Sequence, residues 1–224
     1  PAKGDIMAEI GLAEGIDLLG QRAKLLKILL IAGFAVIAVV LIGQVAELQG
    51  LISLEEGAEL SSGAALYAAA ALADGLLTLV TIVIFAMWVY RAAANVVAAG
   101  TTGFDYTAGW AVGWYFIPFA NLYKPFAAMR QIWNASHGGQ GDQLDQGEGL
   151  LALWWGTWLI SNIASNISFR LTMNPDSIEQ LKLGQQIGAF AALVSLALYP
   201  AAYRLVDRVT AAQRERLSSA HIFS

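Results

Sequence analysis

Few side chains in this sequence combine a chemically active group with an unusual position. Asp74 is the only carboxylate deep within an apolar run, and an ionisable group inside a membrane helix is costly and often functional. Two interpretations stay open: a proton or ion relay, or a hydrogen-bonded structural carboxyl with a partner on a neighbouring helix, such as the one predicted at 150–169. Asn162 and Asn166 stand one helical turn apart. Three roles stay open for their side chains: lining a cavity, binding a head group, or hydrogen bonding between helices.

Basic and aromatic side chains gather in the middle of the chain. Arg91 and Asn95 are one turn apart at the end of an apolar run, and with Lys124 and Arg130 they could cradle a phosphate or a lipid head group. The alternative is an arginine at a helix end, favoured by the helix dipole and the membrane interface. The predicted lipid- or ligand-binding set is Arg91, Asn95, Trp110, Trp114, Lys124, Arg130 and Trp133.

Groups that support catalysis or metal binding are scarce. The chain has no cysteine and two histidines, so disulfides, thiolate nucleophiles and cysteine-ligated metals are excluded. No HExxH, P-loop, GxSxG or GxGxxG pattern occurs in a suitable context. We therefore expect no enzymatic activity, no catalytic residues, no metal and no cofactor. The net charge of −4 gives no basic excess, so nucleic acid is not an expected partner.

Composition places the chain in a membrane. Hydrophobic residues make up 57% of it and charged residues only 13%, about half the share of an average globular protein. About 20 consecutive apolar residues cross the hydrocarbon core as a helix. The runs predict four transmembrane helices, at about residues 25–45, 64–90, 150–169 and 183–205.

Small residues indicate where these helices pack closely. Gly184, Gly188 and Ala192 follow one another at four-residue spacing, a pattern that lets two helix backbones approach. The first half of the helix at 64–90 is rich in alanine, and we expect that half to pack against protein rather than lipid.

Two segments complete the expected fold. Residues 4–20 form a loosely amphipathic, acidic helix broken by glycines. Ala108–Ala120 is rich in tryptophan but, at roughly 20 Å as a helix, too short to cross a core of about 30 Å. We expect residues 108–135 to be re-entrant or interfacial, because tryptophan and tyrosine favour the level of the head groups. Trp110 and Trp114 are four residues apart, so they should share a helix face. After Pro125, an amphipathic helix is predicted, with Arg130, Gln131 and Asn134 on its polar face.

Charge sets the expected threading. With four crossings, eleven of the thirteen Lys and Arg residues fall on one side. Positive residues stay in the cytoplasm, so both termini should be cytoplasmic. We expect one membrane domain covering residues 1–224, located in a bacterial inner membrane.

The sequence resembles a family of bacterial membrane proteins known as DUF4328, a domain of unknown function. The residues that carry the resemblance are Phe85, Trp88, Arg91, Asn95, Gly100, Gly109–Asn121, Pro125 and Arg130–Ser136. Ala108 and Gln131 depart from the family pattern, which often has a proline and an acidic residue there. The resemblance implies the helical membrane architecture and assigns no activity.

The sequence therefore predicts an all-α integral membrane four-helix bundle with a Trp-rich re-entrant or interfacial segment and an N-terminal amphipathic helix. We expect a non-enzymatic accessory or scaffold subunit of a larger membrane assembly. Membrane lipids and either a protein partner or further copies of the chain are its expected partners. The alternative is a small-molecule or ion transporter, or a lipid-binding protein that uses the re-entrant segment.

Overall fold

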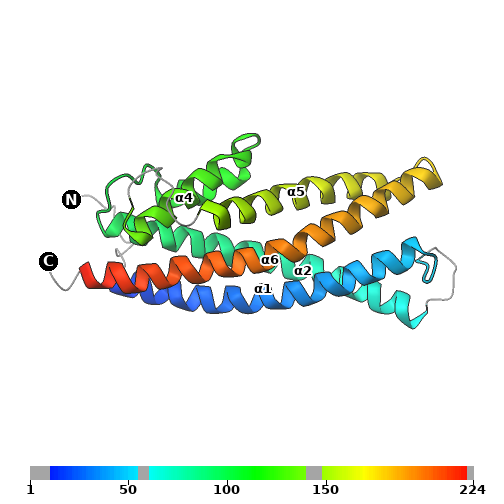
Figure 1. Ribbon diagram of the computed structural model, residues 1–224, viewed down its shortest axis with the longest axis horizontal. Helices are drawn as coiled ribbons and strands as arrows, with labels where there is room; N and C mark the ends of the chain where they lie inside the picture. The colour runs from blue at the N-terminus through cyan, green and yellow to red at the C-terminus, as the bar shows by residue number, and fades with distance from the viewer. Residues whose placement is uncertain (1–10, 55–60, 140–147, 221–224) are drawn as a thin grey trace, which may run out of the picture. The chain divides into compact units, whose positions relative to one another are not determined.

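The computed structural model describes residues 11–54, 61–139 and 148–220, and every regular element in these ranges is helical. This confirms the predicted all-α class. Figure 1 shows the elements, which follow one another as α1 Leu12–Leu48, α2 Ser62–Ala98, α3 Ala108–Gly113, η1 Trp114–Phe116, η2 Ala120–Leu122, α4 Lys124–His137, α5 Glu148–Met173 and α6 Ile178–Ala220, where η1 and η2 are single 3₁₀ turns.

The contacts between residues divide the chain into two compact units. Unit 1 consists of residues 1–25, 85–147 and 206–224, and unit 2 consists of residues 26–84 and 148–205. Helices α1, α2 and α6 contribute to both units, whereas α3 and α4 belong to unit 1 and α5 belongs to unit 2. The sequence patterns predicted a single membrane domain and contained no signal for this division.

Three helices in the described part of the chain are long and apolar enough to cross a membrane: Leu12–Leu48, Ser62–Ala98 and Ile178–Arg216. Each contains one of the predicted runs and extends beyond it. At about 1.5 Å per residue, a helix of 37 residues is roughly 55 Å long, well over the core thickness of about 30 Å. Helix α5 matches the predicted helix at 150–169 in position but is not among the three, so the fourth crossing stays a prediction.

The predicted glycine breaks near the N-terminus are wrong for Gly15 and Gly20. Helix α1 begins at Leu12 and runs through Gly15 and Gly20 without interruption, while residues 4–10 of the predicted amphipathic helix lie outside the described residues. A Cβ atom on Gly15 would collide with the Asn95 side chain, and one on Gly20 would collide with the Arg214 guanidinium. These glycines therefore serve close approach between helices rather than chain breaking.

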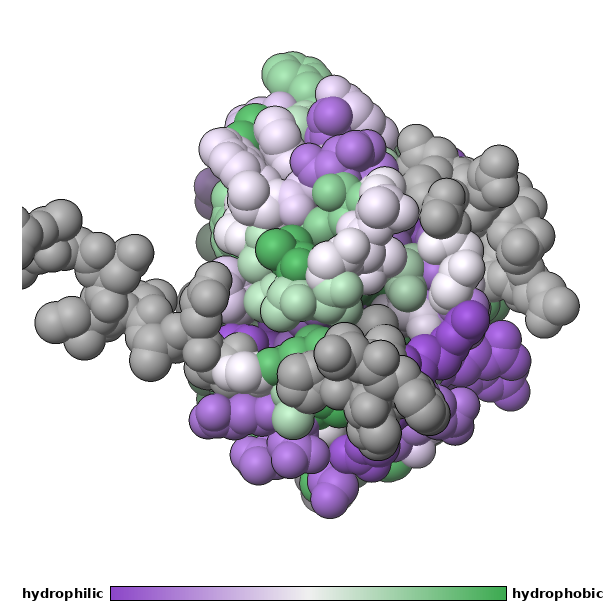
Figure 2. All heavy atoms as spheres, turned by 90° about the vertical axis from the view of Figure 1, so that its left-hand side faces the viewer, coloured by the Kyte–Doolittle hydropathy of each residue, from purple (hydrophilic) through white to green (hydrophobic). Residues whose placement is uncertain are grey.

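Unit 1 has an apolar interior to which four helices contribute. Four helices supply fully or nearly fully buried apolar side chains, which are Ile16, Leu19 and Ala23 of α1, Trp88, Val89, Ala92, Ala93 and Val96 of α2, Ala128, Met129, Ile132 and Trp133 of α4, and Val206, Val209 and Ala212 of α6. The face in Figure 2, seen from the side where α6 ends in Figure 1, is largely hydrophilic or intermediate, with smaller hydrophobic areas.

The predicted amphipathic helix after Pro125 exists as α4, but its polar side is not exposed. Gln131 and Asn134 were expected on the polar face, and both are buried. The reason is that α4 is surrounded on several sides within unit 1, so its polar residues have to find partners inside the protein.

Unit 2 is built differently, with a small core and much exposed apolar surface. Ile37, Val40 and Ala192 form a buried cluster, while large apolar side chains on every helix of this unit face outward. The exposed set includes Ile28, Ile31 and Ile42 of α1, Leu72, Leu76, Leu79 and Val83 of α2, Ile160, Ile163 and Phe169 of α5, and Phe190 and Leu193 of α6. A surface of this kind is suited to lipid rather than to water.

The small-residue prediction is confirmed for α6 but not for α2. A Cβ on Gly184 would lie 2.7 Å from Thr172 Cγ2, and the Ser168 hydroxyl donates a hydrogen bond to the Gly184 carbonyl at 2.8 Å, so α6 and α5 are closely packed there. On α2, Ala64 is buried, but Ala65, Ala69 and Ala73 are exposed. The described part of this chain therefore leaves most of the alanine-rich half uncovered, and the expectation that this half packs against protein stays a prediction.

Candidate functional site

The buried polar groups of unit 1 converge on Gln213. Its amide nitrogen donates hydrogen bonds to the Ala92 carbonyl and to the Ser136 hydroxyl, both at 3.0 Å, and its amide oxygen accepts one from Asn95 Nδ2 at 3.0 Å. The Ser136 hydroxyl in turn donates to the Ile132 carbonyl at 2.7 Å. One fully buried side chain of α6 thus joins α2 and α4, and no pattern in the sequence marked it.

This network changes the interpretation of Asn95. The sequence placed Asn95 beside Arg91 in a head-group or phosphate site. The structure brings both side chains against Gly15 of α1, but Asn95 is 1% exposed and its amide nitrogen is already bonded to Gln213. Asn95 therefore holds helices together and is not presented to a ligand.

Arg91 lies in a basic pair on the same unit. The charges of Arg91 and Arg22 are close enough to interact, and Arg22 also donates a hydrogen bond to the Met87 carbonyl at 2.5 Å. The Nε atoms of both arginines are buried and have no hydrogen-bond partner among the described residues. Lys124 and Arg130, which the sequence had grouped with Arg91, each lie near an aromatic ring of unit 1.

Lys124 sits among aromatic rings. Its ammonium lies 5.5 Å from the centroid of Trp114, 5.6 Å from that of Tyr123 and 5.8 Å from that of Tyr106. A cation over the faces of such rings is stabilised by the ring quadrupoles. Trp110 and Trp114, predicted to share a helix face, are in contact with centroids 4.7 Å apart.

The remaining predicted residues of α4 have structural contacts. Arg130 lies 5.9 Å from the centroid of Phe126, and Trp133 is buried and stacks on His137 at 4.2 Å. Gln131, where the family pattern often has an acid, pairs with Asp105: its amide nitrogen donates to the carboxylate at 3.0 Å and its oxygen accepts from the Asp105 backbone N–H at 2.9 Å.

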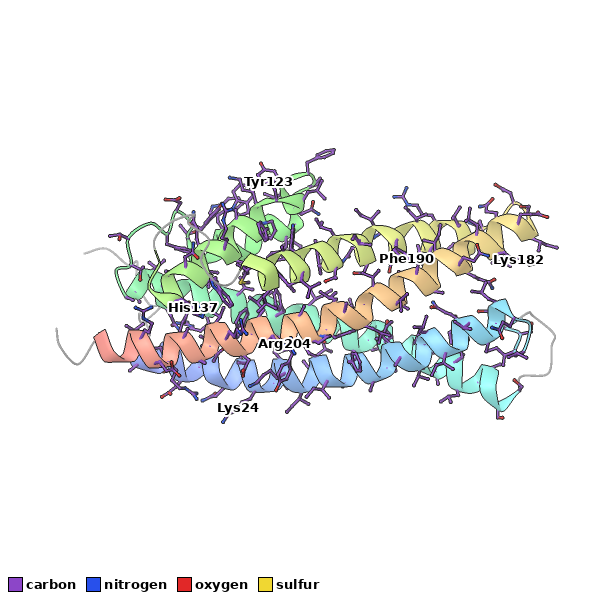
Figure 3. All side chains as sticks on the ribbon, viewed as in Figure 1. Lys24, Tyr123, His137, Lys182, Phe190 and Arg204 are labelled. Carbon is purple, nitrogen blue, oxygen red and sulfur yellow. The ribbon has the colours of Figure 1, made fainter. Side chains whose placement is uncertain are left out.

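His137 ends α4 in a partly buried position. Its Nδ1 atom hydrogen-bonds the Trp133 carbonyl at 2.8 Å, and the charges of Arg216 and Arg208 act on it. Burial lowers the pKa of His137, the two arginines lower it further, and the hydrogen bond to Trp133 opposes them. Figure 3 labels His137 at one end of α4 and Tyr123 beyond the other.

The segment between Trp110 and Tyr123 exposes several large apolar and aromatic side chains, of which the sequence analysis assigned only Trp110 to the binding set. Phe116 is 73% exposed and Phe119 is 83% exposed, and Trp110, Leu122 and Tyr123 are exposed as well. Phe119 adopts φ +63°, the only non-glycine residue with a positive φ in the described chain. A bulky residue in that conformation is strained, and such strain gathers at functional positions. We call these five residues, Trp110, Phe116, Phe119, Leu122 and Tyr123, the aromatic tip.

Asp74 finds its neighbours on α6 rather than on α5, where the sequence placed them. Tyr199 of α6 interacts electrostatically with Asp74 and shares a hydrogen bond with the Thr78 side chain. Tyr199 also lies against Gly33 of α1, which has no side chain to obstruct the ring. One carboxylate oxygen of Asp74 is buried without a hydrogen-bond partner among the described residues.

The two asparagines of α5 do not join helices. Asn162 and Asn166 are exposed, and their amides donate to carbonyls one turn earlier on the same helix, those of Trp158 at 3.0 Å and Asn162 at 2.8 Å. The predicted bonds between helices are therefore wrong for these donors, because the side chains point away from the core of unit 2. Bonding to their own helix satisfies both amides in an apolar setting.

The contacts of these groups are packing contacts, hydrogen bonds and cation–aromatic contacts. Within residues 11–54, 61–139 and 148–220, no three His, Asp or Glu side chains gather in a way that would hold a metal ion. What the geometry offers is a buried amide network, a cation among aromatic rings, an exposed aromatic tip and a carboxyl in an apolar helix.

A chain whose described residues form helices and no strands, with three of these helices long and apolar enough to cross a bilayer, is a helical membrane protein. Residues 53–211, more than half of the chain, match the family described as a domain of unknown function, DUF4328. The chain therefore belongs to the DUF4328 family, as the resemblance of its sequence indicated. No curated protein and no solved structure matches it.

Proposed function

We propose that this protein is a non-enzymatic accessory or scaffold subunit of a larger membrane assembly, and that α2 is the helix it presents to a helix of its partner. The observation that carries the proposal is the poor coverage of α2 by the rest of the chain. Only 6% of its most apolar window is buried, against 28% for α1 and 33% for α6.

Exposure alone would equally fit a helix that faces lipid. The types of the exposed residues distinguish a surface for lipid from a surface for a second helix. Ala65, Ala69 and Ala73 lie at four-residue spacing on α2, and all three are exposed. Small residues at this spacing let a second backbone approach, whereas lipid gains nothing from them. The same spacing at Gly184 and Gly188 of α6 accompanies close packing on α5 within this chain. The corresponding stripe on α2 has no covering helix among the described residues.

The chain offers a clean experiment because it contains no cysteine. The variant Ala69→Cys is labelled with a benzophenone maleimide, a photo-crosslinker, and irradiated in native membranes. The matched control is Ile163→Cys on α5, a position that is also exposed. We expect a defined adduct from position 69 and none from position 163. Adding Ala73→Leu should abolish the adduct, because a larger side chain keeps the second backbone away.

The mass of the adduct separates the forms of the assembly. An adduct of twice the chain mass means that copies of this chain associate, and a different mass identifies another subunit. Equal labelling at positions 69 and 163, an adduct unaffected by Ala73→Leu, or lipid adducts alone would contradict the proposal. A monodisperse monomer in lipid nanodiscs formed directly from native membranes would contradict it as well.

One observation favours the alternative of an ion transporter, namely the buried, unbonded oxygen of Asp74 beside Tyr199. An intramembrane carboxyl is a common element of proton pathways. Proton flux into liposomes containing the purified protein, lost in Asp74→Asn and kept in Thr81→Val, would support this alternative. Thr81 is a suitable control because its hydroxyl bonds only back to the Leu77 carbonyl of its own helix. Equal fluxes from the two variants would dismiss it.

A further inference from the structure

We propose that the aromatic tip of unit 1 docks into the interfacial layer of the bilayer, so that residues 108–123 lie on the membrane surface and do not re-enter it. This inference does not depend on the assembly proposed above. It assigns a lipid surface as the partner of five side chains that unit 1 leaves uncovered.

The first step is the contrast with the rest of unit 1. Its helices α1, α2, α4 and α6 bury many of their large apolar side chains, and the exposed ones, Leu25, Met87, Tyr90 and Val97, are at most 54% exposed. At the tip, Phe116 is 73% and Phe119 is 83% exposed, although the segment itself is packed against α4. Large aromatic groups that gather at one place and are more exposed than any apolar side chain on the helices of this unit indicate a surface that meets something apolar.

The second step is the backbone at Phe119. Phe119 has a positive φ, a backbone conformation that costs free energy in a residue with a bulky side chain. The conformation is not required to bury the ring, because the ring is the most exposed part of the segment. An environment that receives the phenyl group would offset this cost, and water would not.

The third step is the neighbour of the tip on α2. The ring of Tyr115 meets the ring of Phe85 edge-on, with centroids 6.3 Å apart. Phe85 directly follows the stretch of α2 in which Leu79, Ile82 and Val83 are exposed. On α2, Phe85 is followed within two turns by Arg91. A level where an exposed apolar stretch gives way to arginine is where a helix leaves the hydrocarbon.

The fourth step is the chemistry of the tip itself. Tryptophan, tyrosine and lysine are the residues that anchor membrane proteins at the head groups, because each has an apolar body and a polar end. Trp110 and Tyr123 are exposed, and Lys124 holds its ammonium beside the rings of Trp114 and Tyr123. Anionic head groups are attracted to that cation.

The short elements of the segment argue for the surface over re-entry. A re-entrant segment needs two limbs that reach toward the middle of the bilayer. Here α3 has six residues, and η1 and η2 are single turns of three residues each. At about 1.5 Å per residue, α3 spans only roughly 9 Å. A depth of about 5–10 Å suits a segment that lies in the interface.

The test uses single cysteines in the full-length chain, in nanodiscs of phosphatidylcholine and phosphatidylglycerol. Phe119→Cys and Phe116→Cys are labelled with the fluorophore NBD, and Thr102→Cys, on an exposed turn of the same unit, is the control. Lipids with a nitroxide at the head group, at acyl position 5 or at acyl position 12 quench NBD according to its depth.

We expect blue-shifted NBD emission at positions 116 and 119, with strong quenching by head-group and position-5 nitroxides and weak quenching by position 12. Position 102 should show neither effect. Strongest quenching by position 12 would show re-entry and overturn the proposal. Emission like that of position 102, or blue-shifted emission that no lipid nitroxide quenches, would also overturn it, the latter pointing to a protein as the occupant.

Discussion

Gln213 shows how much one side chain can hold in this protein. It is fully buried and makes three hydrogen bonds that reach α2 and α4 from α6. We predict that Gln213→Leu lowers the free energy of unfolding of unit 1 by about 3 kcal/mol, because Asn95 and Ser136 are left buried with fewer partners. Urea titration followed by tryptophan fluorescence measures this.

The control for that variant is Ala211→Leu, an exposed position on the same helix. It adds the same side chain without removing a buried polar group, so the urea midpoint should change little. An equal loss in both variants would mean that the leucine, and not the missing amide, is responsible.

The environment of His137 predicts how the stability of unit 1 depends on pH. Its pKa is lowered in the folded protein, chiefly by burial and then by Arg216 and Arg208. As the pH falls below about 6.5, the unfolded chain binds a proton at His137 while the folded chain does not, so the stability of unit 1 falls. Above that pH the residue is neutral in both states and contributes no slope.

Urea midpoints at pH 7.5 and 5.5 test this linkage. The loss of stability on acidification should be smaller in His137→Gln than in the parent chain. His221→Gln, at the other histidine of the sequence, should retain the full loss. A loss that is identical in the parent and in His137→Gln would show that other groups cause it.

At the scale of residues, the sequence predicted contacts within one helix better than contacts between distant parts of the chain. Trp110 and Trp114 meet, as their spacing predicted, because a helical turn brings positions i and i+4 together. Asn95 and Asp74 found partners on α6, more than a hundred residues away. A single sequence carries no information on such distant pairing, and Gln213 looks like any polar residue in an amphipathic tail. The exposed conformation of Phe119 is likewise set by the tertiary structure.

At the scale of the elements, the close approach of α1 to α2 predicts that Gly15 cannot be replaced without a loss of stability. Gly15→Ala would place a methyl group against the Asn95 side chain, which is fixed by Gln213, so we expect a loss of about 1–3 kcal/mol from overpacking. Gly156→Ala on α5 meets nothing within 4 Å and should change stability by less than about 1 kcal/mol. Urea or thermal unfolding of the two variants compares them directly.

The outcome that would contradict this prediction is Gly15→Ala being as stable as the parent chain. It would mean that α1 and α2 have room between them at this point. Destabilisation by both alanines would instead point to a general intolerance of the helices, and Gly15 would have no special role.

Helix existence was predictable at this scale, and helix length was not. Apolar runs of about 20 residues located a helix at every predicted position. They underestimated α1, α2 and α6, because these helices continue as amphipathic segments whose apolar residues are spaced rather than continuous. Gly15 and Gly20 looked like breaks, and only the side chains opposite them show why glycine is needed.

For the whole molecule, a prediction concerns the side of the membrane on which each loop lies. If α5 crosses the membrane together with the three longer helices, Gly149 and Ser177 lie on opposite sides. In intact cells, we expect an impermeant maleimide to label Ser177→Cys and to leave Gly149→Cys and Thr102→Cys unlabelled until the membrane is opened. If Ser177→Cys and Gly149→Cys were both labelled in intact cells, or if neither were, α5 would not cross the membrane.

The membrane class of the molecule followed from composition, because a chain with 13% charged residues cannot cover a large aqueous surface. The division into two units did not, since both are built from the same three long helices. Hydropathy averages over a helix, whereas the units differ in which sides of those helices are covered, as Ile16 and Trp88 in unit 1 and Ile31 and Leu72 in unit 2 illustrate.

Unit 1 is assembled from the beginning, the middle and the end of the chain. Its core needs Val206, Val209 and Gln213, which leave the ribosome after α1 to α5 have been synthesised. During synthesis, the faces of α2 and α4 that these residues cover therefore stay exposed until α6 has been translated, and a product truncated before residue 206 would never cover them. Such exposed apolar faces are the kind of surface that chaperones and proteases recognise on incompletely folded chains.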